Sequence, residues 1–130
     1  MSGYLLDTHA LLWFETDPAQ LSPNVLSLLK TAGEPAFVSA INLWELGIKF
    51  KLGKLSEAEP LVTNWFSMVA RLEVVDLAFS SLHALEAASL DWGHKDPFDR
   101  ALAAQARVEG LTFVTRDPAF STLPGLKTLW

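Results

Sequence analysis

Short apolar runs alternate along the chain with longer segments in which apolar and polar residues recur at helical spacing. The apolar runs are typical of buried strands, because turn or capping residues bound them on both sides. Strands are expected at 4–6, 36–38 and 112–114, and the runs at 73–75 and 127–129 are candidates for two more. Helices are expected at 8–15, 22–32, 39–52, 60–71, 80–90 and 96–109. The pattern therefore predicts strands and helices in alternation.

Several of these helices carry recognisable boundary signals. Ser22 precedes Pro23, which is the usual order of an N-cap and a first helical residue. Ser39 is a candidate cap for the helix after the second strand, and Gly53 is a stop signal for it. Strands separated by helices pair in parallel and need cover on both faces. The chain is therefore expected to adopt an α/β fold, a three-layer α/β/α domain with a central parallel sheet, in which residues 1–130 form one domain.

The composition narrows the class of protein. The chain has 130 residues, half of them hydrophobic, and a domain of this size can bury roughly two-thirds of its unfolded surface. Cysteine is absent, which excludes disulfide frameworks, cysteine-ligated metals and thiol catalysis. No apolar run approaches the ~18 residues of a membrane span, and residues 1–7 lack the positive start of a signal peptide. A cytoplasmic protein without a membrane partner is expected.

Five acids lie at or soon after the ends of predicted strands or at the start of a helix: Asp7, Glu45, Asp96, Asp99 and Asp117. Glu45 is the one that lies further along, in the second turn of the helix that follows the second strand. Ligands of parallel α/β sheets bind beyond the carboxyl ends of the strands, so these acids could meet at one edge. Carboxylates without cysteine form a hard oxygen site that suits Mg²⁺ or Mn²⁺. The chemistry that such a site favours is metal-assisted attack of water on a phosphodiester.

Most of these acids also have a purely structural interpretation. Asp7 could cap the helix that begins at residue 8, and Asp117 begins a common turn dipeptide. Asp96 has the position of an N-cap, and proline follows it at the first helical position. Asp99 would then occupy the third helical position, where an acid is stabilised by the helix dipole. Local pattern alone leaves both interpretations open for each of them.

Glu45 is ambiguous in a different way. Lys49 follows it by four residues, which is the stabilising order for a surface ion pair. Glu45 also shares a helix face with Ile41 and Ile48. A carboxylate beside an apolar stripe needs a partner, and a metal ion is one candidate. No single acid decides the matter, and the argument depends on several acids arriving at strand ends.

Other candidates for chemistry carry less weight. The histidines, His9, His83 and His94, lack the spacing of metal ligands and are expected to be ordinary polar residues. Neither a glycine-rich phosphate loop nor a nucleophile elbow occurs. The tryptophans are expected in the core or at an interface, and Trp13 and Trp44 could belong to a partner-binding patch.

Four blocks of sequence resemble, in order, those of PIN-domain ribonucleases, and more narrowly those of the VapC-type toxins of toxin–antitoxin pairs. The blocks are YLLDTHALLW at 4–13, VSAINLWELGIK at 38–49, HKDPFDRALAAQA at 94–106 and FVTRD at 113–117. Each block is short, but four in order at these separations are specific. The resemblance covers nearly the whole chain.

The resemblance implies a Mg²⁺-dependent endoribonuclease, with Mn²⁺ as a second suitable cation, that acts on RNA as the toxin of such a pair. The family's four acids fall on Asp7, Glu45, Asp99 and Asp117. Supporting positions are Thr115, which matches the family's hydroxyl near the last acid, the polar residues Thr8 and Ser39, and the extra acid Asp96. The implied protein partners are a small antitoxin and a second copy of the chain, as a homodimer.

A receiver-like signalling domain is the main rival from another class. It would also bind Mg²⁺ through acids at strand ends, and Asp76 could serve as its phosphoacceptor. Receivers carry adjacent acids after the first strand, whereas Asp7 is followed in this chain by Thr8 and His9. A catalytically idle binding module is a further alternative, which an assay of RNA cleavage separates from the enzyme.

The net charge of −5 argues at first against a nucleic-acid partner. Without the five candidate acids, however, ten acids balance ten bases. Six basic residues lie near those acids in the sequence and could rim the site: Lys49, Lys51, Lys54, Lys95, Arg100 and Arg116. Around a metal-neutralised centre they could hold phosphates. The net charge therefore does not exclude RNA.

Overall fold

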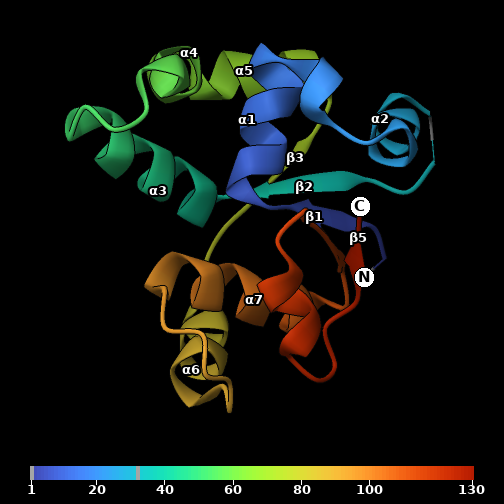
Figure 1. Ribbon diagram of the computed structural model, residues 1–130, viewed down its shortest axis with the longest axis vertical. Helices are drawn as coiled ribbons and strands as arrows, with labels where there is room; N and C mark the ends of the chain where they lie inside the picture. Colours follow the sequence, from blue (N-terminus) through green and yellow to red (C-terminus); the bar gives the residue numbers. More distant parts are fainter. Residues whose placement is uncertain (1, 32) are drawn as a thin grey trace.

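Five parallel strands form the central sheet of the computed structural model, which describes residues 2–31 and 33–130 (Figure 1). The strands are β1 (Tyr4–Leu6), β2 (Ala36–Ser39), β3 (Val75–Leu77), β4 (Thr112–Val114) and β5 (Thr128–Leu129). Their order across the sheet is β3-β2-β1-β4-β5, and every pairing is parallel. The first strand is therefore central, and the residue that follows it lies in the middle of the sheet's carboxyl edge.

Helices cover both faces of this sheet. The α-helices are α1 (Thr8–Thr16), α2 (Pro23–Lys30), α3 (Ala40–Lys51), α4 (Glu59–Thr63), α5 (Trp65–Leu72), α6 (Ser81–Ser89) and α7 (Pro97–Glu109). Short 3₁₀ turns occur at η1 (Pro18–Gln20), η2 (Ser56–Ala58) and η3 (Pro118–Thr122). Figure 1 shows α1 to α5 gathered on one side of the sheet and α6 and α7 on the other. The predicted α/β/α layering with a parallel sheet is thus confirmed.

Alternate strand residues supply two separate cores, as the period of two in a strand requires. Leu6, Val38 and Val114 face one side and pack with buried residues of α1, α2, α4 and α5. Leu5, Phe37 and Phe113 face the other side and pack with the buried face of α7. Because both faces of the inner strands β1, β2 and β4 are covered, these strands consist mainly of apolar residues, which is why short apolar runs identified them.

The helix caps agree closely with the sequence signals. The side chains of Asp7, Ser22, Ser39 and Asp96 each accept a hydrogen bond from a backbone N–H at the start of α1, α2, α3 and α7. Gly110 ends α7 in the left-handed conformation with a φ of 69°. These caps determine where each chain segment turns at the sheet edge.

Three expected elements differ from the structure. The helix expected at 60–71 is divided at Asn64, whose φ of −130° interrupts it between α4 and α5. The strand expected at 73–75 occupies 75–77 instead, because Glu73 adopts a φ of 57° and Val74 is buried as the chain leaves α5. The helix expected at 22–32 ends at Lys30, and residue 32 lies outside the described residues.

None of the helices described at 2–31 and 33–130 combines the length and the apolar character that a membrane crossing needs.

Candidate active site

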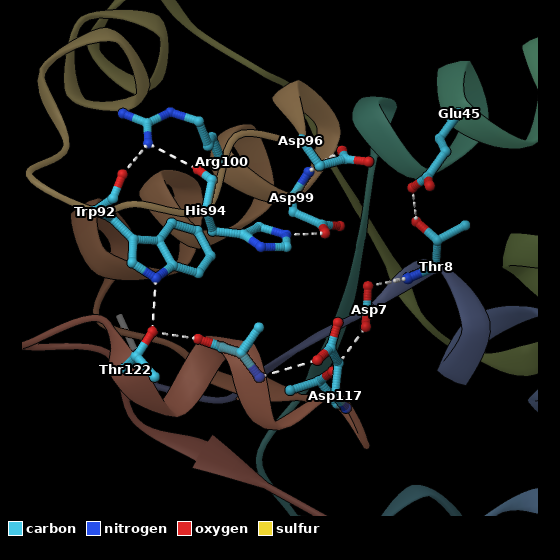
Figure 2. A network of polar contacts seen from close by, with 12 residues as sticks. Asp7, Thr8, Glu45, Trp92, His94, Asp96, Asp99, Arg100, Asp117 and Thr122 are labelled. Atoms are coloured by element: carbon cyan, nitrogen blue, oxygen red, sulfur yellow. Dashed lines mark hydrogen bonds and ion pairs between the residues drawn. The ribbon is translucent and has the colours of Figure 1, made fainter.

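A cavity of about 450 Å³ lies at the carboxyl edge of the sheet. Its lining includes all five candidate acids, Asp7, Glu45, Asp96, Asp99 and Asp117. The other lining residues are His9, Ala10, Trp13, Lys49, Arg116, Pro118 and Trp130. Figure 2 shows the labelled carboxylates facing a common space, although they come from β-strand ends and from two helices on different faces of the sheet. The parallel topology therefore brings together acids that are far apart in the sequence.

Asp7 both caps α1 and lines the cavity, so its capping role does not exclude a role at the site. Its Oδ1 accepts a hydrogen bond of 2.8 Å from the Thr8 N–H, and its Oδ2 accepts one of 2.7 Å from the Thr115 hydroxyl. Burial raises the pKa of Asp7, while the hydrogen bonds from Thr115 and Thr8 act in the opposite direction. A buried carboxylate with a raised pKa gains more from a nearby cation than an exposed one does.

Glu45 is held deep in the site by two partners. It is only 4% exposed, and its Oε1 accepts a 2.6 Å hydrogen bond from the Thr8 hydroxyl. Its Oε2 lies 2.6 Å from the ammonium of Lys49, so the expected i,i+4 pair forms, but with a buried carboxylate rather than a surface one. Asn42 donates to the Thr8 hydroxyl at 3.0 Å and to the Leu6 carbonyl at 3.2 Å, which ties α3 to the end of β1.

Ser39 supports the site from a distance. It is fully buried, and its hydroxyl caps α3, whereas its backbone N–H donates to the Asn42 side chain at 2.7 Å. Ser39 does not line the cavity. It contributes by fixing the start of the helix that carries Glu45.

Asp99 lies in the first turn of α7 and has a histidine as its partner. Its Oδ2 is 2.6 Å from Nε2 of His94. Burial, reinforced by the charges of Asp96, Asp7 and Glu45, raises the pKa of Asp99 to about 6, although the His94 contact opposes the change. The spacing of the histidines in the sequence did not indicate this contact between His94 and a candidate acid.

Asp96 is the N-cap of α7, as expected, and also reaches the cavity. Its Oδ1 accepts a 3.0 Å hydrogen bond from the Asp99 N–H. The cap therefore sets the position of the Asp99 backbone, while its own carboxylate adds negative charge to the lining.

Asp117 follows β4 and starts η3. Its Oδ1 accepts a 2.9 Å hydrogen bond from the Ala119 N–H, and its own N–H donates to the Thr115 hydroxyl at 3.0 Å. The buried Thr115 hydroxyl thus joins Asp7 and Asp117 directly.

A further set of contacts continues from Asp117 to Asp99. Thr122 of η3 accepts a 2.8 Å hydrogen bond from the Trp92 indole. Arg100 donates to the backbone carbonyls of four residues that surround this loop, Ala87, Leu90, Trp92 and His94. Figure 2 shows the arginine on the loop side, pointing away from Asp99. The loop that presents His94 is therefore held by the Arg100 guanidinium and by the hydrogen bond between Trp92 and Thr122.

The family of the chain follows from comparison with known proteins. Residues 4–126 match the PIN domain. The chain belongs to the PIN-domain family. Ribonuclease VapC22 of Mycobacterium tuberculosis is 30% identical to this PIN domain over 118 residues, which is 90% of the chain and 88% of that protein. The chain is thus a homologue of VapC-type ribonuclease toxins.

Solved structures show the same fold. A chain in the crystal structure of VapBC2 from Rickettsia felis, bound to a DNA fragment from their promoter, superposes with a TM-score of 0.72 and 20% identity, covering 98% of this chain and 97% of that one. A chain in a toxin–antitoxin complex from Klebsiella pneumoniae superposes with a TM-score of 0.61 and 17% identity, covering 98% and 96%. The PIN fold predicted from the sequence is confirmed by these likenesses.

The donor set of this PIN domain suits a hard divalent cation. The carboxylates offer oxygen ligands, and Asp7 and Asp99 have pKa values raised by burial, which a cation would relieve. Among the residues that the structure describes, no three acids or histidines already converge as a ready ligand cage. The acids are instead held by Thr115, Thr8, Lys49 and His94, so binding an ion requires side-chain adjustment.

The expected basic rim is only partly present. Lys49 and Arg116 line the cavity, but Lys51, Lys54 and Lys95 are exposed elsewhere. The expectation that Arg100 rims the site is wrong, because its guanidinium donates to loop carbonyls and does not line the cavity. An arginine next to an acid in sequence is drawn inward in this fold because four carbonyls need donors.

The receiver-like alternative does not agree with the topology. The flavodoxin-like order of receivers is 2-1-3-4-5, whereas β3 is an edge strand beside β2 in this sheet. Asp76, the candidate phosphoacceptor, lies within β3 and accepts a 3.3 Å hydrogen bond from the Trp65 indole. It does not line the acid cavity.

Sequence reasoning missed three residues that shape the site. Asn42 donates to the Thr8 hydroxyl, His94 contacts Asp99, and Trp130 lines the cavity. Asn42 had a usable signal, because it occupies the third helical position after a capping serine. Trp130 had none, since only the pairing of β5 with β4 brings it to the cavity.

Proposed function

We propose that this PIN domain is a Mg²⁺-dependent endoribonuclease that serves as the toxin of a toxin–antitoxin pair. The observation that carries the proposal is the convergence of Asp7, Glu45, Asp99 and Asp117 on one cavity. Their chemistry is that of a hard-cation site, and the family relationship supplies the reaction class.

In this proposal Asp7 and Asp99 hold Mg²⁺ most directly, and Asp117 and Glu45 complete its shell directly or through water. Mn²⁺ has the same ligand preferences and could replace it. A bound divalent ion would lower the pKa of a water molecule, orient the scissile phosphate and offset charge on the transition-state oxygens. Attack of the water in line would form one P–O bond as the P–O bond on the opposite side breaks, with one proton lost from the water and one gained by the leaving oxygen.

The remaining residues have orienting tasks. The hydroxyl of Thr115 holds one oxygen of Asp7 and the backbone of Asp117, so one side chain aligns two acids. The hydroxyl of Thr8 holds Glu45, and Ser39 caps the helix that carries it. Asp96 positions the backbone of Asp99. These contacts keep four mutually repelling carboxylates within one cavity before an ion binds.

The partners proposed are an antitoxin, RNA and a second copy of the chain. The similar structures are described as VapBC2 and as a toxin–antitoxin complex, which supports an antitoxin for this chain as well. An antitoxin segment lying over the acid cavity would block cation and RNA together. Co-purification of the protein encoded by the neighbouring reading frame tests this part of the proposal.

Cleavage of RNA by purified variants tests the activity. Asp7→Asn, Asp99→Asn and the double variant are compared with wild type, with Mg²⁺ and with a chelator. Asp91→Asn is the matched control, because Asp91 is exposed and does not line the cavity. We expect cleavage by wild type and Asp91→Asn only with the cation. Full cleavage by Asp99→Asn, or undiminished cleavage in chelator, would overturn the assignment.

A further inference from the structure

One wall of the acid cavity is aromatic and contains an arginine that lies over an indole ring. It consists of His9, Trp13, Arg116 and Trp130, and we refer to these four residues as the aromatic wall. The guanidinium of Arg116 lies 4.6 Å from the centre of the Trp13 ring. The rings of Trp130 and His9 lie 6.0 and 5.5 Å from the Trp13 ring. These residues come from α1, from the end of β4 and from the residue after β5.

Arg116 differs from the other arginines in its polar partners. Arg71 pairs with Glu15 at 2.6 Å, Arg107 pairs with Glu86 at 3.7 Å, and Arg100 donates to loop carbonyls. Within the described part of the chain, Arg116 forms neither an ion pair nor a side-chain hydrogen bond. It is exposed, and it stacks on an indole although several carboxylates line the same cavity. Its N–H donors are therefore available to a ligand.

The indole faces suit a flat partner. Trp13 and Trp130 are half-buried, so their positions are fixed by packing while part of each ring still faces the cavity. Their planes are inclined by 64°, so the two rings form a corner rather than a flat surface. Exposed aromatic faces beside a cation are features with which proteins bind unpaired nucleotides, since a base stacks on a ring and the cation binds the phosphate.

We propose that the aromatic wall is a subsite for one unpaired RNA nucleotide next to the bond that is cut. Arg116 binds a phosphate oxygen, and the corner formed by Trp13 and Trp130 stacks the base. The inference rests on the proposed ribonuclease function, because it places this nucleotide beside the acids. The base must be unpaired, since a base within a helix is already stacked and cannot enter the corner.

The charges of the cavity favour a phosphate ligand over a basic peptide at this wall. A basic peptide side chain would seek the acids and would be repelled by Arg116. A phosphate is instead attracted by Arg116 and is kept from the carboxylates until a cation intervenes. A nucleotide that lies across the cavity therefore needs both Arg116 and the divalent cation.

Binding of a non-cleavable RNA tests the subsite independently of catalysis. The probe is a short single-stranded 2′-O-methyl RNA carrying a fluorophore, and anisotropy is measured with Mg²⁺ at several salt concentrations. The variants are Arg116→Ala, Arg116→Lys, Trp130→Ala and Trp13→Phe. Trp13 is replaced by phenylalanine rather than alanine because it also packs against the core. Lys54→Ala and Trp44→Ala are matched controls, since both residues are exposed and lie outside the cavity.

Arg116→Ala and Trp130→Ala are expected to weaken binding about tenfold, and Arg116→Lys less. Loss of one phosphate contact should also lower the slope of log Kd against log salt by about 0.7. The control variants should bind the probe as tightly as wild type does. All variants should bind a fully paired RNA duplex with the same affinity as wild type. In cleavage assays on a natural RNA, Arg116→Ala should raise KM rather than lower kcat.

The two proposals fail in distinguishable ways. If wild type binds the probe but cuts no RNA, the ribonuclease assignment fails while the subsite stands as a binding site. If RNA is cut but Arg116→Ala and Trp130→Ala bind and cleave like Lys54→Ala and Trp44→Ala, the subsite is wrong. Loss of antitoxin binding without loss of RNA binding would likewise overturn it and assign the wall to protein contact.

Discussion

The Nε2 atom of His94 lies 2.6 Å from Oδ2 of Asp99. The imidazole packs beside the Trp92 ring at 4.8 Å and the Phe120 ring at 6.1 Å, so it has little freedom to turn away. One oxygen of Asp99 is thereby fixed by a loop residue, while the other remains available to the cavity. His94 is a positioning residue for this candidate ligand.

Replacing His94 should lower the affinity for Mg²⁺ more than it lowers the free energy of unfolding. Removal of such an outer contact typically costs 10- to 100-fold in metal affinity or activity. His94→Ala should therefore raise the Mg²⁺ concentration for half-maximal cleavage by about tenfold or more. His94→Gln, whose amide can reach the same oxygen, should recover part of the loss. Equal Mg²⁺ requirements in wild type and His94→Ala would contradict a positioning role.

Loss of the Arg100 guanidinium should destabilise the protein. Three of its carbonyl contacts, to Leu90, Trp92 and His94, are 3.0 Å or shorter, and removing the donors leaves those acceptors unsatisfied. Each such loss costs about 1–3 kcal/mol, and the losses are not fully additive. Arg100→Ala should lower the free energy of unfolding in urea by about 3 kcal/mol. Arg71→Ala, which removes the ion pair between an exposed arginine and Glu15, serves as the control and should lower the free energy of unfolding much less than Arg100→Ala does.

The raised pKa of Asp99 predicts a pH dependence of stability. Its pKa is about 6 in the fold against an ordinary value of 3.8, so between these values the folded state binds more protons than the unfolded state. The carboxyl group therefore lowers stability progressively as the pH rises from about 4 to about 7. Since water still reaches part of the group, the effect should be on the order of 1 kcal/mol.

Comparison with Asp99→Asn isolates this contribution. In chelator, the unfolding free energy of wild type minus that of Asp99→Asn should fall across this pH range. The corresponding difference for Asp91→Asn, an exposed acid outside the cavity, is the control. A wild-type advantage over Asp99→Asn that grows with pH would contradict the predicted direction.

Activity should depend on the hydrogen bonds of the Thr115 hydroxyl rather than on the size of the side chain. It donates to Asp7 at 2.7 Å and accepts from the Asp117 N–H at 3.0 Å. Thr115→Val keeps the shape but removes both contacts, so kcat should fall about tenfold or more, with an unfolding cost of about 1–2 kcal/mol. Thr115→Ser retains the hydroxyl and should keep most of the activity. Equal kcat values for the valine and serine variants would exclude this role.

Much of the site was predictable because its acids have local signatures. Asp7 and Asp117 follow apolar strand runs, and Asp96 and Asp99 begin a helix whose proline and closing glycine mark both ends. Capping and catalytic interpretations competed at these positions. The structure shows that Asp7 and Asp96 cap helices and line the cavity at once, since a helix start at the sheet edge meets both requirements.

The sequence by itself determined the alternation of strands and helices, the caps and the set of acids, because these depend on residues within a few positions of one another. Only the tertiary structure decided which basic and aromatic side chains face those acids. Arg100 and Arg116 each adjoin a candidate acid, yet one turns toward loop carbonyls and the other toward the indole of Trp13. These partners belong to other elements, a loop packed against α7 and the helix that follows β1, so packing between elements, and not local pattern, set the two directions.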